Sequence, residues 1–459
     1  MTSQTEMDRS YVYRISLVAA MGGFLFGYDL SIISGAIIFL KSEFQLSPGS
    51  EAFAIGSATI GCMVGPIAGM WLADSRFGRK WSLMLAAQLF LVGAIGTAFP
   101  RNMIQFNIFR IVGGVGVGLA SVISPMYIAE VSPARIRGRL VTLNQLAIVV
   151  GATAASVLAY LLTPEISGLS PDLSWRWMFA STAVPTIILM AGLFGIPNSP
   201  RWMAERGLDQ EALRVLSRID GPDSARVELK AIQTTLAEEG GSFRELIQPG
   251  VRIALIIAVA LALFQQYTGV STMTFYGPII YQKAGFQQAS HALRLAMFQN
   301  LWNIFITVVS MLIVDRTGRR PLLLWGVAGM GLSQILLGSF FFFNIKGFFV
   351  VTAMYLCMAT YIISLAPLAW LIMSELFPTR IRARGMAFGS LACWVATGTS
   401  IQVLGPLMAY LERTFGNPAG AFWMYAWICL GCWLFSYKMV PETKGKTLEE
   451  IAGIWLQKK

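Results

Sequence analysis

The sequence predicts an all-α membrane protein with twelve transmembrane helices in two similar six-helix halves. Of its 459 residues, 55% are hydrophobic and only 13% are charged. An ordinary soluble protein carries about twice that charged fraction. Twelve apolar runs are long enough to cross a bilayer. Short motifs of the first half also recur in the second, which indicates two related halves.

The apolar runs fall into two sets of six, separated by a charged stretch. They cover residues 13–40, 52–73, 81–99, 104–128, 140–163 and 176–196, then 252–282, 294–314, 321–343, 348–372, 385–411 and 420–440. The charged stretch has an apolar face at Leu213, Leu216 and Ile219, which favours amphipathic surface helices over a flexible linker. We therefore expect four parts: an N-terminal bundle (1–198), a cytoplasmic helical linker (199–248), a C-terminal bundle (249–440) and a cytoplasmic tail (441–459).

Basic residues gather in alternate loops. Four loops are rich in arginine, at 76–80, 135–139, 316–320 and 380–384, whereas the loops between them are poor in it. The positive-inside rule places the rich loops, the linker and both termini in the cytoplasm. This distribution also explains the net charge of +11, so we expect no nucleic-acid partner.

Three motifs repeat about 240 residues apart, as in duplicated transporter halves. Arg76-Phe77-Gly78-Arg79-Lys80 recurs as Arg316-Thr317-Gly318-Arg319-Arg320. Ser132-Pro133-Ala134-Arg135-Ile136-Arg137 recurs as Phe377-Pro378-Thr379-Arg380-Ile381-Arg382, and Pro197-Asn198-Ser199-Pro200 as Pro441-Glu442-Thr443-Lys444. Parallel halves of this kind typically hold their substrate near mid-membrane.

The composition argues against an enzyme. The five cysteines all lie in apolar runs, which excludes a disulfide framework in loops. The chain has one histidine, His291, and no clustered intramembrane carboxylates. We therefore expect no metal, no cofactor and no catalytic residues.

One carboxylate, Asp29, lies in the middle of the first apolar run. Such a group costs about 3 kcal/mol at bilayer depth and usually marks an ion or substrate path. Arg110, inside the fourth run, is its candidate partner. A buried acid–base pair that a proton can open predicts proton coupling.

With these motifs the chain resembles the sugar porter family of the major facilitator superfamily, and within it the bacterial proton-coupled monosaccharide symporters. The specific markers are Gly27-Tyr28-Asp29, the glycine-rich run 110–118, Pro125-Met126-Tyr127-Ile128-Ala129-Glu130, Gln265-Gln266-Tyr267-Thr268-Gly269 and Pro441-Glu442-Thr443-Lys444-Gly445. The resemblance implies the major facilitator fold and proton-driven sugar import by alternating access. It also implies that Asp29 accepts the proton and that Arg110 is its counter-charge. Some coupled relatives carry a further acid where this chain has Thr182.

A sugar site needs neutral hydrogen-bonding groups and an aromatic face. Matching the family pattern, the expected substrate-binding residues are Gln145, Gln265, Gln266, Ser271, Asn303, Trp370 and Trp394. Ala152 and Cys393 stand where the best-known symporters have Gln, and Ser271 where they have Asn. Because these changes remove hydrogen-bonding capacity, the sequence does not identify which sugar or polyol is the substrate.

The cytoplasmic motifs predict a gate of ion pairs at helix ends. We expect Glu130 to pair with Arg137, Glu375 with Arg382, and Asp315 with Arg319. Ser75 stands near the usual acid slot of the first-half loop, with Asp74 one residue earlier, and Asn198 replaces the usual Glu of its motif. Several such pairs forming together can bias a two-state equilibrium although each is weak.

Four alternatives to proton-coupled monosaccharide import remain. They are a facilitative sugar or polyol uniporter, an inositol–proton symporter, a nutrient sensor and a drug–proton antiporter. A sensor usually adds a long signalling tail, and an antiporter cavity is usually more apolar and aromatic. We expect a multi-pass protein of the cell inner membrane whose partners are a sugar, a proton and lipid, and which acts as a monomer.

Overall fold

The computed structural model describes residues 8–133, 135–238, 246, 248, 251–377 and 381–442, apart from the side chains of residues 235, 237, 238, 315, 316, 382 and 383. The described chain folds into helices, and no strand occurs in these ranges. Twelve segments of it are long and apolar enough to cross a membrane. The predicted all-α class and the number of spans are therefore confirmed.

The first six spans occupy the chain before the linker. They are formed by α1 (Arg9–Glu43), α2 (Pro48–Asp74), α3 (Gly78–Ala98), α4 (Met103–Val131), α5 (Arg137–Leu161) and the pair α7 (Pro171–Ala180) and α8 (Ala183–Phe194), with the short α6 (Pro164–Ser167) before α7. Glycines let these helices approach closely. A Cβ atom at Gly65 would lie 2.5 Å from Cα of Gly118, and one at Gly93 would lie 2.8 Å from Cα of Gly113. The glycine-rich run of α4 thus packs against both α2 and α3.

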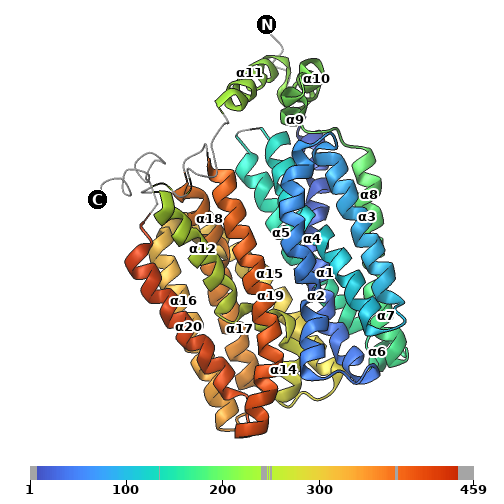
Figure 1. Cartoon of the computed structure of the whole chain (residues 1–459), viewed down its shortest axis with the longest axis vertical. Coiled ribbons are helices and arrows are strands. Elements are labelled where there is room, and N and C mark those ends of the chain that lie inside the picture. The colour runs from blue at the N-terminus through green and yellow to red at the C-terminus, as the bar shows by residue number, and fades with distance from the viewer. Residues whose placement is uncertain are drawn as a thin grey trace. The chain divides into compact units, whose positions relative to one another are not determined.

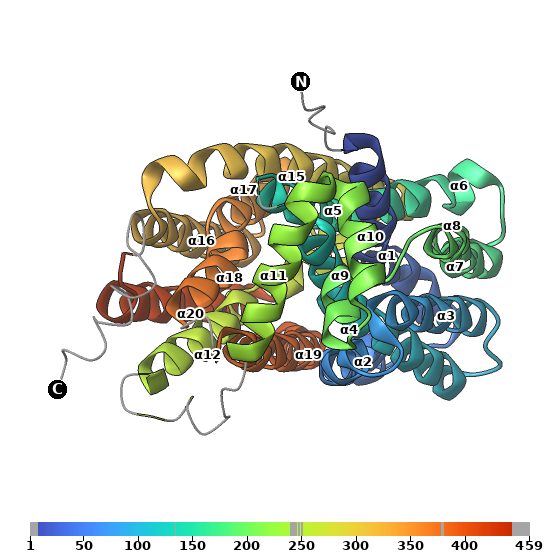
Figure 2. The same ribbon diagram turned by 90° about the horizontal axis from the view of Figure 1, so that it is seen from above.

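The charged stretch after the sixth span forms three short helices, as the apolar face predicts. They are α9 (Pro200–Glu205), α10 (Asp209–Asp220) and α11 (Pro222–Glu238). The three pack on one another, and α9 also contacts α4 (Figure 2). They lie at the end of α3 and α4 that carries the loop between α2 and α3 (Figure 1). Ala212, Leu216 and Ile219 of α10 are buried in this packing.

The last six spans are formed by helices of the second half. They are α12 (Val251–Tyr267) with α13 (Val270–Phe275) and α14 (Gly277–Lys283), then α15 (Ala289–Thr317), α16 (Arg319–Phe342), α17 (Phe348–Ile363) with α18 (Leu365–Leu376), α19 (Arg382–Phe415) and α20 (Ala419–Met439). The single run predicted over 252–282 is therefore broken. At the first break Gly269 has φ +97°, a conformation that glycine adopts without strain. A Cβ there would also lie 2.4 Å from Nε2 of Gln334.

The chain divides into two compact units built from discontinuous segments. Unit 1 comprises Met1–Leu30, Ile60–Ala155 and Arg176–Gly240, and unit 2 comprises Ser31–Thr59, Ser156–Trp175 and Gly241–Lys459. Helices α1, α2, α5 and α7 each contribute to both. The ion pair predicted at mid-membrane lies in unit 1, and most of the predicted amide residues lie in unit 2.

Candidate functional site

Asp29 and Arg110 form an ion pair inside unit 1. Nη1 of Arg110 lies 3.0 Å from Oδ2 of Asp29 and also donates to the Asp29 backbone carbonyl at 3.3 Å. The Arg110 side chain is 1% exposed, and the Asp29 side chain is 7% exposed. The predicted pairing of these two residues is therefore present. At such burial each charge depends on the other, because an unpaired ion in this setting is strongly unfavourable.

The surroundings of the pair leave part of the guanidinium without a hydrogen bond. Nε and Nη2 of Arg110 have no hydrogen-bond partner within the described residues. The ring of Phe179 lies 5.6 Å from Cζ of Arg110, a distance at which a cation interacts with an aromatic face. The arrangement thus holds one carboxylate and one cation in a poorly solvated place, where adding a proton to Asp29 would leave Arg110 uncompensated.

The sixth span supplies hydroxyl groups beside this region. Tyr28, which precedes Asp29, shares a 2.7 Å hydrogen bond with Ser181. Thr182 is 1% exposed, and its Oγ1 lacks a hydrogen-bond partner within the described residues. These groups are neutral hydroxyls, whereas Asp29 is the carboxylate paired with Arg110.

One hydrogen-bond network in unit 2 joins three of the predicted binding residues, Gln265, Gln266 and Ser271, to the thiol of Cys393. Nε2 of Gln266 donates to Sγ of Cys393 at 3.3 Å, and Ser271 donates to Oε1 of Gln266 at 2.8 Å. Cys393 donates in turn to Oε1 of Gln265 at 3.5 Å. The structure thus brings Gln265, Gln266 and Ser271 together, with the thiol between the two amides.

The remaining hydrogen-bonding capacity of Gln265 goes to the backbone. Its Nε2 donates to the carbonyls of Leu365 at 3.3 Å and Ala366 at 3.0 Å, which follow the break between α17 and α18. Gln265 is 2% exposed, and it satisfies two backbone carbonyls beside this break. Gln266, which is half-buried, is the more accessible amide of the two.

The other predicted binding residues are distributed over four helices. Asn303 of α15 is 6% exposed and lines a cavity inside unit 2. Trp394 of α19 is 8% exposed, and Trp370 of α18 is half-buried. Gln145 lies on α5 in unit 1, where its side chain is exposed. Asn303 is thus the predicted binding residue that borders an internal space in unit 2.

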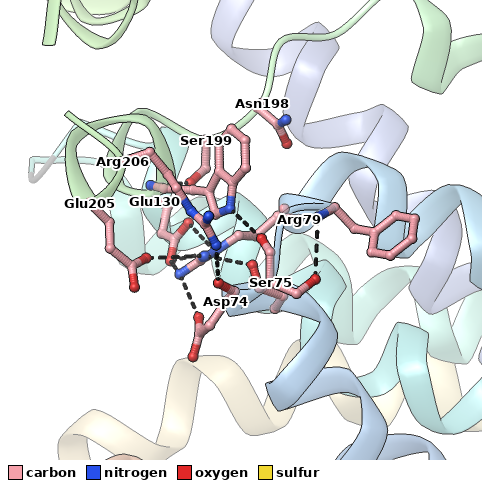
Figure 3. Close-up of polar contacts among 12 residues, drawn as sticks. Asp74, Ser75, Arg79, Glu130, Asn198, Ser199, Glu205 and Arg206 are labelled. Atoms are coloured by element: carbon pink, nitrogen blue, oxygen red, sulfur yellow. Dashed lines mark hydrogen bonds and ion pairs between the residues drawn. The ribbon is translucent and has the colours of Figure 1, made fainter. Parts of the chain in front are cut away.

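Arg79 is the centre of an ionic cluster at the end of unit 1 where α2 meets α3 (Figure 3). Its Nε lies 3.1 Å from Oε2 of Glu130, and its Nη2 lies 3.2 Å from Asp74. A third carboxylate, Glu205 of α9, lies 3.7 Å from Nη1. The Arg79 side chain is only 4% exposed, so three carboxylates surround one buried cation.

The helix α9 is held to the same loop by further contacts. Nε1 of Trp202 donates to the carbonyl of Ser75 at 3.0 Å, and Arg206 donates to the carbonyl of Asp74 at 2.7 Å. Asn198 accepts a hydrogen bond from the backbone N–H of Lys80 at 3.1 Å. Burial and the neighbouring Asp74 raise the pKa of Glu205, although Arg79 opposes the shift.

These contacts correct the predicted gate of the first half. Glu130 pairs with Arg79, while Nη2 of Arg137 lies 3.1 Å from Glu228 of α11. The reason is geometric. α4 ends at Val131 and α5 begins at Arg137. The Arg137 guanidinium donates through Nε to the carbonyl of Ser132, the residue after α4, and through Nη2 to Glu228 of the linker, so it is already satisfied without Glu130. A second linker pair joins Arg135 to Asp220 at 2.7 Å.

The second half has a related arrangement inside unit 2. Nη2 of Arg319 lies 3.4 Å from Oε1 of Glu375. Glu442 accepts hydrogen bonds at 3.1 Å from the backbone N–H groups of both Arg319 and Arg320, at the start of α16. The side chains of Asp315 and Arg382 lie outside the described residues, so their predicted pairs stay predictions.

Comparison with known proteins decides the family. The model of the family described as "Sugar (and other) transporter" matches residues 15–455. This chain belongs to the sugar transporter family. Its members are transporters and not enzymes, which confirms the prediction that the chain is not an enzyme.

The sequence of this sugar transporter is similar to those of individual relatives over nearly its whole length. It is 38% identical to the arabinose-proton symporter of Bacillus subtilis, over 97% of this chain and 96% of the relative. It is 35% identical to the D-xylose-proton symporter of Escherichia coli, over 98% and 97%. An inward-open structure of the xylose transporter XylE from E. coli matches with a TM-score of 0.85 and 33% identity, over 97% of this chain and all of that one.

Some residues of this sugar transporter were missed by sequence reasoning. Arg79 belongs to a repeated motif, and Glu205 and Glu228 belong to the charged stretch after the sixth span, but neither pattern indicates which ion pairs these residues form. Asn300, three residues before Asn303 on α15, also lines the cavity of unit 2. A polar residue one helical turn from a predicted binding residue was the available signal for it.

Proposed function

We propose that this sugar transporter imports a monosaccharide together with a proton, by alternating access. The observation that carries the proposal is the buried pair of Asp29 and Arg110. Relatives that cover nearly the whole chain are named as arabinose-proton and xylose-proton symporters, which favours a pentose as the substrate.

The chemistry of the pair supports coupling to a proton. With Asp29 ionised, the pair is neutral overall and costs less free energy to bury than the Arg110 cation alone. Protonation of Asp29 removes its charge, leaves the Arg110 cation alone, and so favours a conformation in which Arg110 has other contacts. Binding of the proton and of the sugar is then coupled if both favour the same conformation.

The neutral polar and aromatic side chains of unit 2 support a neutral, hydroxylated substrate. Gln266, Ser271 and Asn303 offer donors and acceptors without net charge, and Trp370 and Trp394 offer aromatic faces for the C–H surface of a sugar. Gln145 and Gln265 stay proposed members of this site. We propose the ion pairs of Glu130, Arg137, Arg319 and Glu375 as gate contacts that form and break in the cycle.

The proposal extends to the cellular setting. The twelve spans make the protein a multi-pass membrane protein. We propose that it lies in a cell inner membrane with both termini in the cytoplasm, that the proton is its coupling ion without a further cofactor, and that it acts as a monomer. The basic loops and the bacterial relatives support this placement.

Uptake by proteoliposomes tests the function. Purified protein is reconstituted, and uptake of labelled arabinose, xylose, glucose and inositol is measured with and without an inward proton gradient. The proposal predicts accumulation of at least one pentose above the outside concentration when the gradient is present. Uptake that only equilibrates, whatever the gradient, would identify a uniporter instead.

A further inference from the structure

Asn300 connects Ser156 and Asn303 inside unit 2. Nδ2 of Asn300 donates to Oγ of Ser156 at 2.7 Å and to the backbone carbonyl of Ala296 at 3.3 Å. Nδ2 of Asn303 donates to Oδ1 of Asn300 at 3.4 Å. A hydroxyl of α5 and two amides of α15 are therefore joined in one chain of hydrogen bonds.

This chain of hydrogen bonds fixes which way each amide faces. The carbonyl of Ala296 can only accept, so the amide nitrogen of Asn300 must be on that side. The Oδ1 atom of Asn300 then faces Asn303. Because that oxygen can only accept a hydrogen bond, Asn303 must donate to it through its own amide nitrogen. As a result, the Asn303 oxygen is the atom left over, and it has no hydrogen-bond partner within the described residues.

The Asn303 side chain borders a small polar cavity. The cavity has a volume of about 20 Å³, and a water molecule or a single hydroxyl needs about 10–15 Å³. Its lining includes Asn300 and Asn303, together with Ser31, Ser34 and Gln299. A buried acceptor without a partner costs free energy, so a group that donates a hydrogen bond to it would be bound favourably.

We propose that Asn300 is a positioning residue that makes Asn303 present an acceptor, and that the cavity thereby selects a substrate hydroxyl that donates a hydrogen bond. The inference rests on the proposed function, because it takes the substrate to be a sugar or polyol. A hydroxyl that donates to Oδ1 of Asn303 would replace a water molecule of the same chemistry. A hydrogen, or a fluorine that cannot donate, would leave the acceptor unsatisfied.

The experiment compares the substrate with two series of analogues in proteoliposomes. The best sugar of the uptake panel is measured beside its monodeoxy and deoxyfluoro analogues, for the wild-type protein and for Asn300→Leu. We expect one ring position at which both analogues raise the KM of the wild-type protein about tenfold. In Asn300→Leu the KM of the parent sugar should rise about tenfold, so that the preference over both analogues disappears while the maximal rate stays within about threefold.

Two further variants separate positioning from a general loss of structure. In the Asn303→Leu background, Asn300→Leu should raise the KM no further, because residues that act through one another are not additive. Gln334→Leu is the matched control. It removes a buried amide of α16 that bonds Thr268 and does not line the cavity, and it should leave the preference over the analogues unchanged.

Several results would overturn the inference. An unchanged preference in Asn300→Leu, or an additive effect of the two α15 variants, would show that Asn300 has only a structural role. A deoxyfluoro analogue that binds as well as the parent would show that the cavity donates instead. If Asn300→Leu does not fold, Ser156→Ala is measured in the same assay. It removes one of the two acceptors that hold the Asn300 amide nitrogen, so it should weaken the preference over the analogues by a smaller factor, and an unchanged preference would overturn the inference. Absence of any sugar uptake by the wild-type protein would instead refute the proposed function itself.

Discussion

Asn198 and Glu442 hold corresponding positions in the two repeated motifs, and each accepts hydrogen bonds from the backbone at the start of a span. Asn198 receives one from Lys80 at the start of α3. Glu442 receives two, from Arg319 and Arg320, at the start of α16. The first half therefore uses a neutral amide where the second uses a carboxylate, although a helix N-terminus favours negative charge.

Replacing the amide by the acid should stabilise the first half. Asn198→Glu places a carboxylate at the N-terminus of α3, which we expect to add about 0.5–1 kcal/mol to the free energy of unfolding. Thermal unfolding of the purified protein in detergent measures the effect. The opposite change, Glu442→Gln, should lower the unfolding temperature. An unfolding temperature that falls in Asn198→Glu would contradict this account of the cap.

Glu205 should make the stability of the protein depend on pH in a defined direction. Burial and Asp74 raise its pKa in the folded protein, so the folded state binds the proton more tightly than the unfolded state. Stability from Glu205 is therefore present at low pH and is lost as the pH rises through the raised pKa. We expect Glu205→Gln to be more stable than the wild-type protein at neutral pH.

The pH series supplies the check on that expectation. The difference in unfolding temperature between Glu205→Gln and the wild-type protein should shrink as the pH falls below about 3.5, where the carboxyl group is protonated in both states because the ordinary pKa of Glu is about 4.3. Glu211→Gln, an exposed change on α10, is the control. A constant difference across the series would contradict the raised pKa.

Arg79 should matter far more than its neighbour Arg76. Arg79→Gln leaves Glu130, whose side chain is 10% exposed, without its cation, and we expect a loss of about 3 kcal/mol of stability. Arg76→Gln removes the same charge from an exposed position of the same loop and should change stability by less than about 0.5 kcal/mol. Thermal unfolding measures both variants. Equal losses of stability in the two would show that the ionic cluster around Arg79 does not cause the loss in Arg79→Gln.

The thiol of Cys393 should contribute to substrate affinity through its hydrogen bonds. It accepts from Gln266 and donates to Gln265, so Cys393→Ala frees both amides and should raise the KM about threefold to tenfold. Cys393→Ser keeps a donor and an acceptor and should stay close to the wild-type value. Initial rates of sugar uptake measure both variants. A KM of Cys393→Ala equal to that of the wild-type protein would show that this hydrogen-bond network does not belong to the binding site.

The spans could be predicted from the sequence because hydropathy is a local property. Each run of about twenty apolar residues must bury its backbone polar groups within one helix. The Asp29–Arg110 pair was also predictable, since the first span carries one acid and the fourth span a candidate cation for it. The break at Gly269 was not predicted, because it depends on the close approach of Gln334 from α16.

Partner choice in the charged loops could not be derived from the sequence. Glu130 has Arg135, Arg137 and Arg139 within ten residues, yet it pairs with Arg79 from another span. Which cation it meets depends on how α3 and α4 pack, and neither charge pattern nor spacing specifies that. The role of Asn300 was hidden for the same reason, because its partner Ser156 is on α5.

The most direct test of proton coupling is the change Asp29→Asn, which keeps the shape of the side chain but removes its proton site. Accumulation of sugar against its gradient and counterflow exchange are both measured in proteoliposomes, and thermal unfolding verifies that the variant is folded. The account predicts that accumulation is lost while counterflow continues. Accumulation at the wild-type level by Asp29→Asn would contradict it.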